Sequence, residues 1–206
     1  MTPSFTVVHL RGTEVEMGHQ HGAIVAQGGG RPELVDFYPG MAGRLLSLRS
    51  PNAHRRAFRG VLQPFLTSSA ARLHKARVER FPTLAARAEA ALSASGHGPG
   101  LLRWLTVMDV FQNAIGRLAR LRLPQLTGLR LAGIPMCSSL AVWGDASADG
   151  TLRHARNFDF PGIGVWDTHP TVAFCTPDDG LRYGYVTSLG IDLPGITGFN
   201  EAGLTL

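Results

Sequence analysis

Cysteine is scarce in this chain, with two residues among 206, and the familiar metal-binding spacings are missing. No CxxC or HExxH pattern occurs, which excludes a Cys-rich zinc site and the zinc-protease helix. No apolar run approaches the roughly 20 residues of a membrane helix, and no basic stretch with a long apolar core opens the chain. We therefore expect a cytoplasmic protein without membrane partner, metal or cofactor, in which each cysteine is inert core or part of the chemistry.

Acidic residues are few in the first two thirds of the chain. Residues 1–136 hold 17 Lys and Arg against 7 Asp and Glu, a net charge of +10, whereas residues 137–206 hold 3 against 8, a net charge of −5. A basic half is typical of nucleic-acid-binding proteins, but here the basic residues are dispersed at helical spacing. No helix-turn-helix, RNP or KH pattern accompanies them. We predict solvated helix faces and no nucleic-acid partner, with a basic helical binding module without catalysis as the alternative.

The spacing of apolar residues changes near residue 135, from helical to strand-like. A short strand is expected over 5–10. It is followed by Thr13 and, three residues later, Glu16, a capping box that predicts the start of a helix. Further helices are expected over 32–48, over 52–78 with a break at Pro64, over 82–94 and over 101–121.

After residue 137, short apolar stretches alternate with turn residues, among them the hairpin dipeptide Asp149-Gly150. Strands are expected over 140–143, 151–157, 171–176, 183–188, 196–199 and 204–206. Together they predict a meander of antiparallel strands in an α+β domain. Because no turn or polar tail follows the last strand, we expect a C-terminally truncated fragment; a compact chain whose last strand lies at a sheet edge is the alternative.

Cys137 lies at the boundary between the helical and the strand-rich regions. An ordinary cysteine thiol, with a pKa of about 8.5, is mostly protonated at neutral pH and needs an activating base. The free α-amine of the same residue, with a pKa of about 7.7–8.0, would serve as that base. It exists only if the Met136-Cys137 peptide bond has been cut. Taken alone, such a cysteine is more often an inert core residue than a nucleophile.

Two downstream segments supply polar partners for Cys137. In the segment Arg156 to Phe160, the carboxylate of Asp159 would hold an amine and Arg156 would orient that carboxylate or the substrate. The same two residues are also typical of a surface ion pair, which contributes little. In the segment Gly198 to Leu204, the side-chain N–H of Asn200 would stabilise an oxyanion, although asparagine is equally an ordinary turn residue.

Four short motifs follow one another in order. They are Cys137-Ser138-Ser139, Asp149-Gly150, Arg156-Asn157-Phe158-Asp159-Phe160 and Gly198-Phe199-Asn200-Glu201-Ala202-Gly203-Leu204. In this order they resemble the N-terminal-nucleophile (Ntn) superfamily of choloylglycine hydrolases and penicillin V acylases. The stretch from Leu10 to Gly22 looks more like the branch typified by isopenicillin N acyltransferase, the C45 peptidase family.

The resemblance implies two segments of an autocatalytically processed precursor. Residues 1–136 would form a helical pro-segment, and residues 137–206 would begin an Ntn-type αββα sandwich, incomplete here because the family has further strands and catalytic residues beyond this point. The implied activity is hydrolysis or acyl transfer at an amide bond of a small-molecule substrate. An inactive fragment of such an enzyme is the alternative, and the oligomeric state stays open.

The same resemblance implies roles for individual residues. Cys137 corresponds to the nucleophile and, through its amine, to the base. Asp159 corresponds to the aspartate that contacts this amine, and Arg156 to the arginine beside it. Asn200 corresponds to the asparagine that lines the oxyanion hole.

Overall fold

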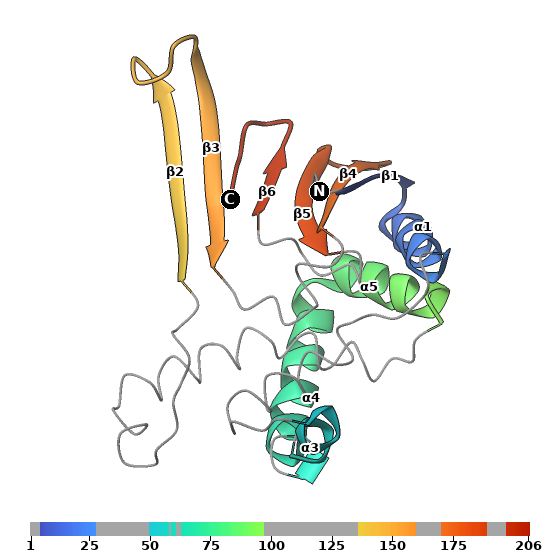
Figure 1. Cartoon of the computed structure of the whole chain (residues 1–206). Coiled ribbons are helices and arrows are strands. Elements are labelled where there is room, and N and C mark those ends of the chain that lie inside the picture. The colour runs from blue at the N-terminus through green and yellow to red at the C-terminus, as the bar shows by residue number, and fades with distance from the viewer. Residues whose placement is uncertain are drawn as a thin grey trace, which may run out of the picture.

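The computed structural model of the chain combines helices with two separate β-sheets (Figure 1). It describes residues 5–27, 50–57, 59–60, 63–96, 136–159, 170–188 and 197–206. The α+β class predicted from the sequence is confirmed. The helices expected over 32–48 and 101–121 lie outside the described residues.

The first strand and helix form where the sequence predicts them, with β1 over Thr6–Gly12 and α1 over Glu14–Gln27. The capping box between them is present. The Thr13 N–H donates to Glu16 Oε2 at 2.7 Å, and the Glu16 N–H donates to Thr13 Oγ1 at 3.3 Å. The bond from the Thr13 backbone, followed by that from its hydroxyl, lowers the pKa of the Glu16 carboxyl.

The helical stretch predicted over 52–78 contains α3 over Pro51–Ala57 and α4 over Gln63–Arg80. Pro64 lies in the first turn of α4 and not in its interior. Proline is tolerated in the first turn because its missing N–H would have had no partner there. The Ala-rich α5 spans Pro82–Ala94, again with proline in its first turn, as the sequence predicts.

The larger sheet has four strands in the order β1-β4-β5-β6. β4 (Pro170–Pro177), β5 (Tyr183–Ser188) and β6 (Thr197–Asn200) are antiparallel neighbours, while β1 pairs with β4 in parallel. β2 (Met136–Gly144) and β3 (Gly150–Asp159) form a two-stranded sheet of their own. This corrects the expected single meander. Alternation along a strand specifies its two faces, but not which strand it pairs with.

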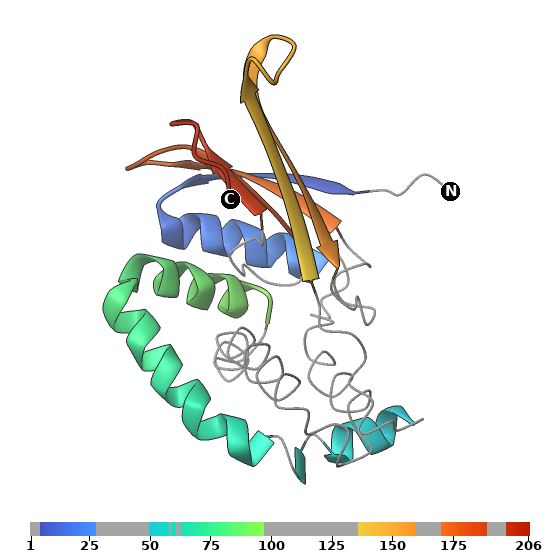
Figure 2. The same ribbon diagram turned by 90° about the vertical axis from the view of Figure 1, so that its left-hand side faces the viewer.

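One face of the four-stranded sheet packs against α1. Residues of β1, β4 and β5 on this face form the core with α1: Val8, Leu10, Met17, Ala173, Cys175 and Tyr185. Helix α5 lies against α1 (Figure 2). Two glycines permit this approach, because a Cβ on Gly18 or Gly22 would lie 2.3 Å from Arg87 O or 2.2 Å from Ala91 O, respectively.

The opposite face of the four-stranded sheet is apolar and exposed. Val7, Phe174, Val186 and Phe199 all expose more than a third of their surface. The Phe174 ring stacks on His9 with centroids 5.3 Å apart and meets the edge of Phe199 at 6.0 Å. The described helices lie on the other side of the sheet (Figure 2). A row of aromatic rings therefore crosses a sheet face that no described helix covers.

Candidate functional site

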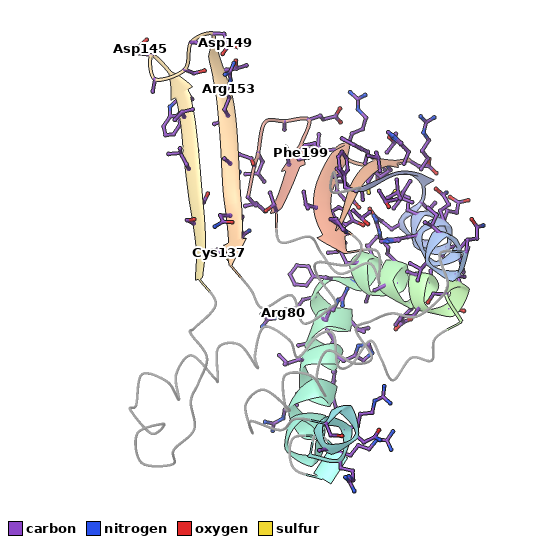
Figure 3. The ribbon with its side chains drawn as sticks, in the orientation of Figure 1. Arg80, Cys137, Asp145, Asp149, Arg153 and Phe199 are labelled. Atoms are coloured by element: carbon purple, nitrogen blue, oxygen red, sulfur yellow. The ribbon has the colours of Figure 1, made fainter. Side chains whose placement is uncertain are left out.

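The β2–β3 hairpin brings three of the four predicted site residues to one end. Cys137 pairs with Phe158, Ser139 with Arg156, and Met136 with Asp159. Because side chains alternate along a strand, Cys137 and Arg156 belong to the same face of the hairpin. The backbone of Asp159 lies opposite Met136, the residue before the predicted cut; its side chain lies outside the described part of the structure. Figure 3 shows Cys137 at the end of the hairpin away from the turn.

The register of this hairpin is fixed at its turn by Asp149. Its carboxylate accepts hydrogen bonds from the Thr151 N–H at 3.1 Å, from Ser147 Oγ at 3.0 Å and from Arg153 Nη2 at 2.8 Å, and it also bonds the Thr151 hydroxyl. The bonds from the Thr151 hydroxyl and backbone are the main cause that lowers the pKa of Asp149 to about 2. Gly150 supplies the positive φ that the turn requires.

The two cysteines differ in exposure. Cys175 is buried in the core on β4, whereas Cys137 is exposed near the start of β2. Both are free thiols. An exposed thiol is open to a substrate or to a reactive carbonyl group, which a buried one is not.

Asn200 lies at the end of β6, on the other sheet. Its side-chain oxygen accepts hydrogen bonds from the backbone N–H groups of Ala202 at 3.1 Å and Leu204 at 3.0 Å. These bonds hold the turn that leads into the last segment, where Gly203 has a φ of 86°. Asn200 is therefore a turn residue that stabilises the backbone after β6. Because the oxygen makes these bonds, the amide nitrogen of Asn200 retains its two donor hydrogens for a ligand.

A cavity of about 670 Å³ borders Asn200. Its walls are formed mostly by apolar residues of α4, α5 and the last segment: Leu73, Phe81, Leu84, Leu204 and Leu206. Arg77, Arg80 and Arg87 also line it, and none of the described residues that line it is acidic. This size suits a small molecule with an apolar part. Cys137 and Arg156 are not among the lining residues.

Arg87, which also lines the cavity, is a buried cation that the sequence did not reveal as a functional residue. Its Nη1 donates to Glu14 Oε2 at 2.8 Å and to the Tyr183 hydroxyl, and its Nη2 donates to the Tyr185 hydroxyl at 2.9 Å and to Cys175 Sγ at 3.4 Å. Only 2% of the side chain is exposed. A buried charge needs such partners because its desolvation is costly. The sequence offered little to predict its burial, since Arg87 is simply one arginine on an Ala-rich helix.

A hydrogen-bonded chain of three side chains joins the hairpin to the last segment. Ser139 Oγ lies 2.6 Å from His154 Nε2, and His154 Nδ1 lies 2.6 Å from Thr205 Oγ1. Thr205 forms a β-bridge with Phe199 beside β6. Figure 1 shows β3 next to the last segment, near the C-terminal label. The half of the site around Cys137 is thereby linked to the half around Asn200.

Within the described ranges, no three His, Cys, Asp or Glu side chains gather closely enough to bind a metal. The helices in those same ranges are each too short or too polar to cross a membrane. In comparisons with known proteins, no family model and no curated protein matches the chain.

Proposed function

We propose that this chain carries the nucleophile of an Ntn-type cysteine enzyme that hydrolyses amide bonds or transfers acyl groups, and that it cuts itself before Cys137. The observation that carries the proposal is the register of the β2–β3 hairpin. It sets an exposed Cys137 on one face with Arg156 and aligns Asp159 with Met136 across the ladder. These are the residues that the resemblance names for nucleophile, arginine and amine-binding carboxylate.

The chemistry begins in the uncut chain. The thiolate of Cys137 attacks the carbonyl carbon of Met136, the C–N bond breaks, and the nitrogen takes up a proton to become the α-amine of Cys137. Water hydrolyses the resulting thioester, releasing the carboxylate of Met136 and restoring the thiol. The α-amine then acts as the base in each later turnover.

Arg156 and Asp159 have distinct roles in the cut enzyme. The carboxylate of Asp159 would hold the newly formed ammonium or amine of Cys137 by charge and hydrogen bonding. Arg156, which belongs to the same face of the hairpin as Cys137, would orient that carboxylate or the substrate.

The acyl part of the substrate would occupy the cavity beside Asn200. Its apolar walls suit a hydrocarbon or aromatic acyl group, and the exposed Arg80 at its edge favours an anionic substituent. The amide nitrogen of Asn200, held in place through its oxygen, would donate to the oxyanion of the acyl intermediate.

The exposed apolar face of the four-stranded sheet supports the sandwich architecture. In an αββα fold, each sheet packs one face on helices and the other on a second sheet. Here one face packs on α1 and the opposite face carries the His9–Phe174–Phe199 row. A second sheet on this row would complete the sandwich.

Intact-mass analysis of the purified chain tests the proposal. The wild type is expected to give two polypeptides split between Met136 and Cys137, and Cys137→Ala is expected to stay intact. Cys175→Ala is the matched control and should still be cut, because that thiol is buried in the core. An uncut wild type that hydrolyses amides would overturn self-cleavage, and thiol labelling of an internal Cys137 would then identify an unprocessed cysteine enzyme.

A further inference from the structure

The uncut precursor lacks the base that the cut enzyme uses in turnover. Before the cut, the nitrogen of Cys137 belongs to a peptide bond and has no basic lone pair. The α-amine that serves as base in turnover is therefore absent during self-cleavage. A different group must accept the thiol proton at that stage.

The precursor needs another base, and Ser139, His154 and Thr205 are joined by hydrogen bonds. We infer that His154 is the proton acceptor for self-cleavage, acting through the hydroxyl of Ser139. The inference rests on the proposed self-cleavage before Cys137. It assigns His154 and Ser139 as positioning and proton-relay residues of the precursor.

Geometry favours this relay. Ser139 lies two residues after Cys137 on the same strand, so both side chains project from one face, about 7 Å apart along the strand. His154 reaches Ser139 from the neighbouring strand at 2.6 Å. A single water can bridge the remaining gap between thiol and hydroxyl, since Cys137 is exposed.

Thr205 can hold the tautomer that the relay uses, because its hydroxyl is able to accept a hydrogen bond. When the Nδ1–H of His154 donates to Thr205 Oγ1, the lone pair of Nε2 points at the Ser139 hydroxyl, across the two 2.6 Å contacts. Ser139 then passes its own proton to Nε2 as it receives one from the thiol. The imidazolium returns that proton by the same route to the departing nitrogen of Cys137. No proton is left over.

Among the described residues, few titratable or charged side chains lie on the face of the hairpin that carries the relay. On the His154 face of the hairpin, Cys137 is the titratable group that β2 contributes and Arg156 is the charged group that β3 contributes. The contact from the last segment is the uncharged Thr205. Arg156 is therefore the charged side chain among the described residues on this face of the hairpin.

The test follows cleavage of newly translated full chain by mass spectrometry between pH 5.5 and 9. His154→Gln can still bond both hydroxyls but cannot accept a proton, and it should cut about 10²-fold more slowly than wild type. The rate of His154→Gln should also lose the pH dependence that a histidine base gives to cleavage. Ser139→Ala should be slow and Ser139→Thr should recover. His19→Gln, an exposed histidine on α1, is the matched control and should cut like wild type.

A fold defect is separated by chemical rescue. Added imidazole should accelerate cleavage of His154→Ala but not of Ser139→Ala, which lacks the intermediate hydroxyl. Cleavage of His154→Gln at the wild-type rate with an unchanged pH profile would overturn the relay and leave self-cleavage intact. A wild type that stays uncut while Cys137 is reduced would overturn self-cleavage itself, and the relay with it.

Discussion

Asn200 uses the two ends of one amide for different purposes. The oxygen holds the turn after β6 by accepting two backbone N–H groups, and the nitrogen remains available as a donor beside the cavity. A turn asparagine and an oxyanion donor are therefore compatible roles for the same residue. Because the turn bonds fix the plane of the amide, they also preorganise the donor.

Asn200→Asp separates these two roles. Aspartate keeps an oxygen for Ala202 and Leu204 but removes the donor hydrogens. We expect its turnover of an activated anilide to fall about 10²–10³-fold while the melting temperature stays near that of wild type. Asn200→Ala should lose both activity and stability. Full activity in Asn200→Asp would limit the residue to its turn role.

The sequence predicted individual residues best where the partner is close along the chain. The Thr13–Glu16 capping box and the Asp149-Gly150 turn were readable because donor and acceptor are within a few residues. The link between His154 and Thr205, 51 residues apart, was not. Nor was the burial of Arg87, because its partners Tyr183 and Tyr185 come from a different segment.

At the scale of helices and strands, small residues allow α1 and α5 to pack closely. Gly18 and Gly22 are one helical turn apart and face the backbone of α5, so that the two helices approach closely. The sequence predicted both helices from periodicity and caps. It did not predict their contact. Glycine lowers helix propensity, so Gly18 and Gly22 on their own indicate a less stable helix and not a site of close packing.

Gly22→Ala tests this packing. The new Cβ would lie 2.2 Å from Ala91 O and 2.7 Å from the Ala94 Cβ, so the helices must separate. We expect the free energy of unfolding to fall by about 1–3 kcal/mol, even though alanine favours a helix. His19→Ala, exposed on the same helix, should change it by no more than about 0.5 kcal/mol. Urea denaturation measures both. A Gly22→Ala protein as stable as wild type would contradict the close approach.

Strand pairing was the weakest part of the sequence prediction. Most strands form where alternation and turn residues indicated, but β1 joins β4 in parallel and β2–β3 stands apart from the larger sheet. Pairing a strand near the start of the chain with one after residue 170 requires tertiary contacts that no local pattern contains. The Cys137 hairpin was predictable because its two strands are joined by one short turn.

At the scale of the whole molecule, the two sides of the predicted cut form a single core. The parallel pairing of β1 with β4 runs from Thr6–Thr171 to Gly12–Pro177. Arg87 and Glu14 precede residue 136, whereas the partners of Arg87 on β4 and β5 follow it. After a break before Cys137, the β1–β4 pairing and the hydrogen bonds from Arg87 to Cys175 and Tyr185 would therefore still join the two fragments.

We predict that the fragments 1–136 and 137–206 stay associated after the cut, whether it arises by self-cleavage or at a protease site engineered there. They should co-elute in size-exclusion chromatography and separate only in denaturant. Arg87→Ala should lower the denaturant concentration for separation markedly, because removing one partner of a buried pair costs about 3–5 kcal/mol. Arg153→Ala, which breaks an exposed pair with Asp149, should change it little. Separation of the wild-type fragments in buffer would contradict a shared core. If Arg87→Ala leaves the denaturant concentration for separation unchanged, the association of the fragments would be due to the β1–β4 pairing alone.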